Sequence, residues 1–279
     1  MEKTFDVSGP VRLDVVLNAG VIEVEPTLEG KVDVELIAHD SESQQLVDSA
    51  RVELRGSGER PEIVVHVPAR QRSWGLASLL NRQTISCRIQ CPPGSDLKAR
   101  TKSADVRSRG TLGEADAATA SGDVHIGDTL AEISLKSASG DLTAGNVGGR
   151  ATANTVSGDI TVASVSGPVE ANSVSGDIEI GSADAGVKAH SVSGDINIGA
   201  VVEGSAAVNC VSGDVEIGVR RGSRVHLDCS TVSGDARSEL ELGSDEPEGD
   251  GPFVDLKART LSGDITVSRA AAPAEAVHA

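Results

Sequence analysis

The tripeptide Ser-Gly-Asp recurs through the second half of this 279-residue chain and constrains its fold more than any other feature. Five copies follow one another at steps of 18 residues, three more follow at wider steps, and a degenerate copy precedes them. The copies begin at Ser103 (the degenerate one), Ser121, Ser139, Ser157, Ser175, Ser193, Ser212, Ser233 and Ser262. Because self-similarity at a fixed period is typical of stacked repeats, we interpret each unit as one coil of a solenoid.

Each unit carries the pattern of two strands that flank the Ser-Gly corner. Ile178 and Ile180 enclose a polar Glu179, and this alternation indicates a strand with one buried face. Val169 and Ala171 mark the second strand, and alternating large and small residues suit two closely packed sheets that hold few aromatic rings. We therefore predict an all-β, single-stranded parallel β-solenoid with 18-residue coils about 4.8 Å apart, right-handed by the usual crossover preference.

The chain is expected to form one continuous domain with distinct parts. Residues 1–100 are strand-like but irregular, so we expect imperfect coils that cap the N-terminal end, with a short helix or a loop at 43–52. Residues 101–269 should form the regular solenoid, interrupted by an acidic surface loop at 239–252 and followed by a disordered tail at 270–279. The segment 71–83 holds the single Trp and is interpreted as a lid over the open solenoid end; the alternative is an exposed apolar loop that contacts a partner or a membrane.

The composition limits the classes of partner and compartment. The formal net charge of −17 argues against general binding to nucleic acid or to anionic membranes. Neither a signal peptide nor a stretch long enough to span a membrane is visible, and four Cys do not make a disulfide framework, so we expect a cytoplasmic protein. Cys210 and Cys229 are expected on neighbouring coils as diagonal neighbours, too far apart for a disulfide.

The repeated V-S-G-D-I-x-I units, with Ser103-Ala104-Asp105-Val106 upstream and the segment 218–235 downstream, carry a resemblance to a known family. The chain resembles a bacterial family of unknown function whose members are catalogued as SGD β-strand repeat proteins or "putative adhesins". The similarity covers about residues 5 to 268. It implies a β-solenoid, and it implies no catalytic residues because the family has none assigned.

The aspartates of the repeats should stack in a row at one corner of the solenoid. One interpretation is turn chemistry, in which Gly takes a positive φ while Ser and Asp side chains bond nearby backbone amides. The alternative is calcium held between coils, because hard cations prefer oxygen ligands. The G-G-x-G-x-D pattern of calcium-binding β-rolls is absent, so we favour turn chemistry and assign no metal site. The row comprises Asp123, Asp141, Asp159, Asp177, Asp195, Asp214, Asp235 and Asp264.

Nothing in the chain indicates catalysis or a cofactor. A hydroxyl ladder two residues before each Ser-Gly-Asp should be satisfied by hydrogen bonds along the stack, and no His follows it at a fixed offset to act as a base. The patterns G-x-S-x-G, P-loop and G-x-G-x-x-G are absent. We predict no catalytic, cofactor-binding or metal-binding residues, and a protein that is not an enzyme.

Charge is distributed unevenly along the chain. Residues 70–109 hold nine basic and two acidic side chains, whereas 239–250 hold six acidic side chains and no basic one. One hypothesis is head-to-tail self-association between these regions, and the alternative is that the basic side chains are simply solvated. The function predicted is a non-catalytic, adhesin-like interaction scaffold that binds a protein partner or itself. A calcium-dependent adhesin-like protein and an acidic rod that mimics nucleic acid are the alternatives.

Overall fold

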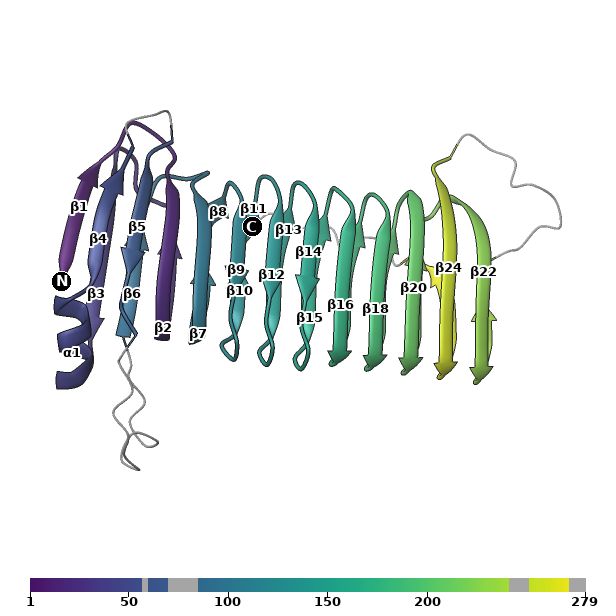
Figure 1. Ribbon diagram of the computed structural model, residues 1–279. Helices are drawn as coiled ribbons and strands as arrows, with labels where there is room; N and C mark the ends of the chain where they lie inside the picture. The colour runs from purple at the N-terminus through teal and green to yellow at the C-terminus, as the bar shows by residue number, and fades with distance from the viewer. Residues whose placement is uncertain (57–59, 70–84, 241–250, 271–279) are drawn as a thin grey trace, which may run out of the picture.

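A computed structural model describes residues 1–56, 60–69, 85–240 and 251–270 of the chain. The molecule is an elongated stack of β-coils, with the N-terminus at one end (Figure 1). Hydrogen bonds join 25 strands into one network, and 17 of them form a parallel sheet that turns through 338° about the long axis. The predicted all-β solenoid is confirmed.

The regular part of the stack is built from short strands that follow the repeat. Most of these strands pair in parallel with the strand 18 residues further along the chain, so that Ile160 lies beside Ile178 and Ile178 beside Ile196. The step is 19 residues from β18 to β20 and from β19 to β21. These strands are β8 (Thr111–Leu112), β9 (Ala115–Ala118), β10 (Val124–Ile126), β11 (Asp128–Thr129), β12 (Ile133–Lys136), β13 (Leu142–Val147), β14 (Ala151–Asn154), β15 (Ile160–Val165), β16 (Val169–Ser175), β17 (Ile178–Ala183), β18 (Val187–Ser193), β19 (Ile196–Val201), β20 (Gly204–Ser212) and β21 (Val215–Val219).

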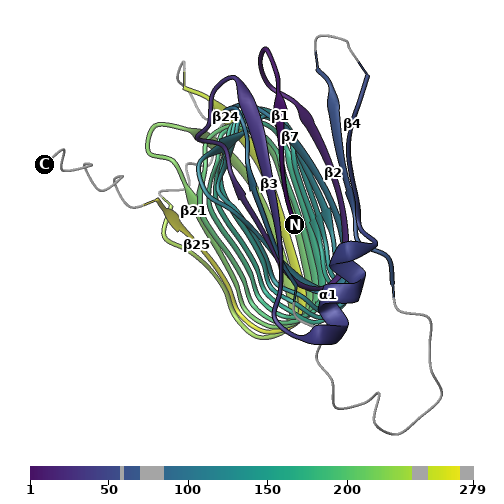
Figure 2. The ribbon, with the colours of Figure 1, turned by 90° about the vertical axis from the view of Figure 1, so that its left-hand side faces the viewer.

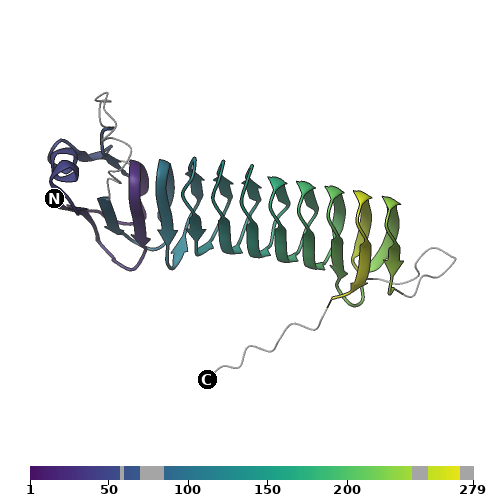
Figure 3. The same ribbon diagram turned by 90° about the horizontal axis from the view of Figure 1, so that it is seen from below.

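The core between the two long faces is thin and aliphatic. The two predicted inward rows are buried: Ile178 and Ile180 are at most 1% exposed, and Val169 and Ala171 at most 3%. Viewed from below, the strands of the two faces lie close together along the whole stack (Figure 3). An alanine row opposite larger aliphatic rows lets the faces approach, which explains why the chain needs so few aromatic rings.

The N-terminal end departs from the repeat and mixes parallel with antiparallel pairs. Strand β2 runs beside β7 in parallel through a whole coil, while β1 pairs antiparallel with β3, β3 with β6, and β4 with β5. The helix α1 lies across this end (Figure 2). These elements are β1 (Glu2–Asp6), β2 (Arg12–Glu25), β3 (Lys31–Ala38), α1 (Ser41–Asp48), β4 (Arg51–Arg55), β5 (Glu62–His66), β6 (Ile85–Gln90) and β7 (Asp96–Ser108).

A short helix at residues 41–48 resolves the choice between helix and loop that the sequence left open. Asp40 caps it, because its carboxylate accepts a hydrogen bond of 2.7 Å from the backbone N–H of Ser43. Val47 is fully buried against the solenoid core. The helix therefore covers apolar surface at the N-terminal end.

At the other end the chain does not stack in sequence order. Strand β24 (Phe253–Ser262) pairs with β20 on one side and with β22 (Arg224–Ser233) on the other, and β25 (Ile265–Arg269) likewise lies between β21 and β23 (Ala236–Ser238). The last coil in the sequence is thus the second to last in space, and β22 is the outermost strand (Figure 1). The expectation that successive coils stack in order is wrong here.

Several predicted features lie outside the described residues. These are the whole of the lid at 71–83, most of the acidic loop at 239–252, and the predicted tail apart from Ala270. Ala270 itself is buried, and its backbone N–H donates to the carbonyl of Val219.

Candidate interaction surfaces

The Ser-Gly-Asp motif forms a sharp corner where the chain passes from one long face to the other. Gly176 has φ of 147° and Gly194 of 142°, a region that disfavours residues with a Cβ. A Cβ on Gly176 would overlap the carbonyl of Gly158 in the coil below, and would lie 2.6 Å from that carbonyl carbon. The glycine is therefore required twice, by the turn and by the close approach of adjacent coils.

The corner aspartates form one continuous row along the solenoid. The backbone N–H of Asp177 donates to Oδ1 of Asp159 over 2.8 Å, and that of Asp195 donates to Oδ1 of Asp177 over 2.8 Å. The same bond repeats at every step, and it links coils rather than closing a turn within one coil. In spatial order the row is Asp105, Asp123, Asp141, Asp159, Asp177, Asp195, Asp214, Asp264 and Asp235.

Only the two ends of this row have arginine partners. Asp105 pairs with Arg107 at 3.1 Å and Asp235 pairs with Arg237 at 2.8 Å. Within the described residues, the seven aspartates between them form no ion pair. The middle of the corner is therefore a line of exposed carboxylates without neutralising charge.

A row of exposed aliphatic side chains runs parallel to the aspartates. The residue directly before each Ser-Gly-Asp faces outward, because the residue before it points into the core. Six of the ten large hydrophobic side chains that are exposed in the described part of the chain lie in this single row. We call it the valine ridge, and in spatial order it comprises Val156, Val174, Val192, Val211, Leu261 and Val232.

Sequence reasoning missed the valine ridge, although a signal was present. The inward residues lie two, four and six positions before the Ser, so the residue one position before it must face solvent. A polar residue is expected at such a position, and a repeated Val there breaks the alternation. An apolar residue at the outward-facing position of the alternation, repeated in coil after coil, indicates an exposed apolar surface.

Behind the ridge lies the predicted hydroxyl row. At its N-terminal end Thr101 donates to Oγ1 of Thr119 over 2.9 Å. In the middle, four buried hydroxyl oxygens lack a hydrogen-bond partner within the described protein, so the prediction that the row is satisfied along the stack is wrong there. They belong to Ser137, Thr155, Ser173 and Ser191.

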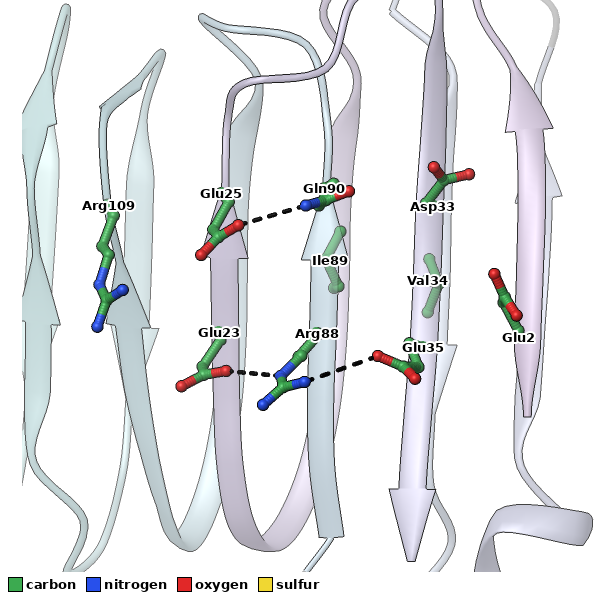
Figure 4. Close-up of a pocket in the computed structure, with 10 residues that line it drawn as sticks. All are labelled: Glu2, Glu23, Glu25, Asp33, Val34, Glu35, Arg88, Ile89, Gln90 and Arg109. Atoms are coloured by element: carbon green, nitrogen blue, oxygen red, sulfur yellow. Dashed lines mark hydrogen bonds and ion pairs between the residues drawn. The ribbon is translucent and has the colours of Figure 1, made fainter.

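A second surface feature is a hollow of about 490 Å³ on the outer face near the N-terminal end. Arg88 lies between Glu23, at 3.0 Å, and Glu35, at 4.0 Å, and the three side chains form a line across the strands (Figure 4). A hydrogen bond to Thr4 holds the pKa of Asp33 below its usual value. Five carboxylates and two arginines line the hollow, so its lining carries a net negative charge that is unfavourable for an anionic ligand.

The cysteines are thiols and are separated in space. Burial raises the pKa of Cys87 to about 12 and that of Cys91 to about 11. Cys210 and Cys229 do not lie on neighbouring coils, because β24 inserts Ala258 beside Cys229 and Thr260 beside Cys210. The predicted diagonal proximity is therefore wrong, and all four cysteines are free thiols.

The basic residues of the 70–109 segment are placed only in part. Arg70, Arg72 and Arg82 lie outside the described residues. The described basic residues lie along the sides of the stack. Arg88 is on β6, Arg109 directly follows β7, and the others are on β7 itself. Strands β1, β3 and β4 and the helix α1 lie beyond them at the N-terminal end (Figures 1 and 2). The head-to-tail hypothesis stays a prediction.

The described residues contain neither a cluster of metal ligands nor a membrane-spanning helix. No three His, Cys, Asp or Glu side chains in the described ranges gather closely enough to hold a metal ion. The one described helix is too short and too polar to cross a membrane.

Comparison with known proteins identifies the fold and gives descriptions of its relatives. A "putative adhesin" from Bacteroides fragilis is 14% identical over 96% of both chains, with a TM-score of 0.50. A "putative lipid binding protein" from Parabacteroides distasonis is 15% identical over 96% of both chains, with a TM-score of 0.53. At these identities the likeness shows the fold alone, and the descriptions indicate no catalytic role. No curated protein matches the chain.

A family model matches residues 12–268, from the start of β2 into β25, and so covers most of the irregular first strands and the Ser-Gly-Asp coils. Its description differs from the SGD-repeat name that the sequence suggested, and that name is not confirmed. The chain belongs to the Toastrack DUF4097 family.

Proposed function

We propose that this protein is a non-catalytic, adhesin-like interaction module that binds a partner protein along its Ser-Gly-Asp corner. The observation that carries the proposal is the valine ridge, because soluble proteins rarely keep a contiguous apolar row in water without a use for it. Its residues repeat at about 4.8 Å along the stack, so an elongated partner can make the same contact several times. The descriptions of structural neighbours as adhesins agree with a binding role.

The two alternative functions gain less support. A calcium-dependent module needs several oxygen ligands on one ion. Along the corner, however, Oδ1 of the carboxylates already accepts a hydrogen bond from a backbone N–H of the next coil, as at Asp159 and Asp177. A nucleic-acid mimic needs dense charge: a duplex carries one charge per about 1.7 Å of axis, and the aspartate row offers one per about 4.8 Å.

The proposal is tested by photo-crosslinking in cells from three positions of a single coil. A photoreactive amino acid replaces Val174 on the ridge, Glu170 on a flat face, or Asp184 at another turn, and all three side chains are exposed. We expect a discrete crosslinked partner from position 174 and only background from 170 and 184. Absence of a crosslinked species from all three positions, or the same yield from each, would contradict the proposal.

A further inference from the structure

We propose that the ridge binds a cationic amphipathic helix of its protein partner, along the four coils that carry Val156, Val174, Val192 and Val211. This inference rests on the function proposed above and adds the chemistry of the partner. It combines two properties of the same corner, its apolar row and its uncompensated charge.

The apolar row is long enough for several helical turns. Val156, Val174, Val192 and Val211 are 54%, 48%, 40% and 39% exposed, and Leu261 and Val232 continue the row. Six residues at steps of about 4.8 Å span about 24 Å, the length of roughly 16 helical residues. The helical pitch of about 5.4 Å is close to the coil spacing, so successive turns of a helix would meet successive side chains of the ridge.

The charge beside this row is acidic over the same coils. Asp159, Asp177, Asp195 and Asp214 line one side of the four valines, and Glu179 and Glu216 extend the acidic surface outward. Over these four coils the other side is lined by neutral Asn side chains and His190, and the basic residues of the same row, Lys136 and Arg259, lie on the coils at either end. An apolar stripe flanked by lysines or arginines would complement both features at once.

The carboxylates are held in place before any partner arrives. Each of these four aspartates uses Oδ1 to accept a backbone hydrogen bond of 2.8 Å from the next coil. The bond fixes the carboxylate beside its valine, and the second oxygen remains available to a cation. Because little side-chain freedom is lost on binding, a weak charge pair at each coil adds up along the row.

Other occupants of the ridge are less complementary. A second copy of the chain carries the same acidic corner and the same net charge of −17, so charges would repel where the ridges meet. An anionic lipid surface is repelled for the same reason. These occupants are outcomes of the test below.

The test uses a defined probe and the full-length protein. The probe is a fluorescent Leu/Lys peptide of roughly 18 residues with all Leu on one helical face, and its control has the same composition scrambled so that no face forms. Fluorescence anisotropy measures the dissociation constant at low, intermediate and high salt. We expect the amphipathic probe to bind, binding to weaken with salt, and the scrambled probe to bind at least tenfold more weakly.

Two variants of the ridge separate its charge from its apolar surface. Replacing each of the four Asp with Asn keeps the Oδ1 acceptor and removes the charge, and replacing each of the four Val with Thr keeps the shape and β-branching but adds a hydroxyl. We expect each variant to weaken binding of the probe roughly tenfold, because the first loses four charge pairs and the second loses four apolar contacts. A charge-matched control away from the ridge should bind as the wild type does; it combines Glu132→Gln, Glu170→Gln, Asp184→Asn and Glu203→Gln.

Several results would overturn the inference. These are no binding of the amphipathic probe, equal binding of both peptides, or an Asn variant that binds as tightly as the wild type. Binding to phosphatidylcholine vesicles that the Thr variant loses would point to a lipid surface, and dimerisation that the Thr variant loses would point to a second copy. Crosslinking from position 174 without probe binding would refute the cationic helix alone, whereas absence of both would contradict the proposed function as well.

Discussion

Replacing one corner glycine with alanine should destabilise the solenoid far more than the same change at a glycine in open space. The site chosen is Gly176, in the middle of the stack, where φ is 147°. Gly222 is the matched control, because its φ of 88° is also positive but a Cβ there would meet nothing within 4 Å. Gly9 is a second control, with neither a positive φ nor a neighbour within 4 Å.

The expected magnitudes follow from these surroundings. At Gly9, alanine only restricts the unfolded chain, so the effect is close to zero or stabilising by up to about 1 kcal/mol. At Gly222, the left-handed backbone alone costs about 1–2 kcal/mol. At Gly176, a backbone region that is nearly exclusive to glycine costs about 1–3 kcal/mol, and overlap with the carbonyl of Gly158 adds about 1–3 kcal/mol.

Urea unfolding followed by far-ultraviolet circular dichroism measures all three variants against the wild type. The free energy of unfolding should be highest for Gly9→Ala, lower for Gly222→Ala and lowest for Gly176→Ala. The difference between the last two variants should be larger than the error of the measurement. If Gly176→Ala proved as mild as Gly222→Ala, the coils would be able to separate at the corner without cost. Our explanation of why Ser-Gly-Asp keeps its glycine would then be wrong.

Three further predictions concern the core, the thiols and the last coils. Ile178→Ala, at a side chain that is 1% exposed, should cost about 2–5 kcal/mol in thermal unfolding, whereas Glu179→Ala on the outward side should stay within about 0.5 kcal/mol. Because burial raises the pKa values of Cys87 and Cys91, neither thiol should react with Ellman's reagent at mildly alkaline pH until denaturant is added; fast reaction of the native protein would contradict their burial. Deletion of residues 222–253 should leave a folded, cooperatively melting protein, since β24 and β25 already stack on β20 and β21; aggregation or non-cooperative melting would count against this topology.

Much of the fold could be predicted because one short motif fixes the register. The pairing of Ile160 with Ile178, and of Ile178 with Ile196, follows directly from the 18-residue step, and the inward rows follow from alternation. The order of the last coils could not be predicted in this way. Strands β22 and β24 carry the same inward pattern, so periodicity alone cannot tell which of them lies next to β20.

The candidate surface was predicted only in part, for a related reason. The aspartate row follows from the repeat, but the role of Asp177 as an acceptor for the next coil depends on the distance between coils. The antiparallel pairs near the N-terminus depend on which strands meet after the long connections, and β3 shows no feature that would identify β1 and β6 as its partners. Local patterns specify faces, whereas neighbours between distant segments are decided by the whole fold.

The insertion of the last coil between its predecessors affects how the chain is assembled during translation. Strand β22 leaves the ribosome before β24, yet β24 is the strand on which it stacks. Most coils meet a completed neighbour as soon as they emerge, but the coil of β22 and β23 must wait for the final residues of the stack. A ribosome that stops short of residue 253 therefore leaves the coil of β22 and β23 without its native neighbour, so the far end of the rod is completed only in full-length chains.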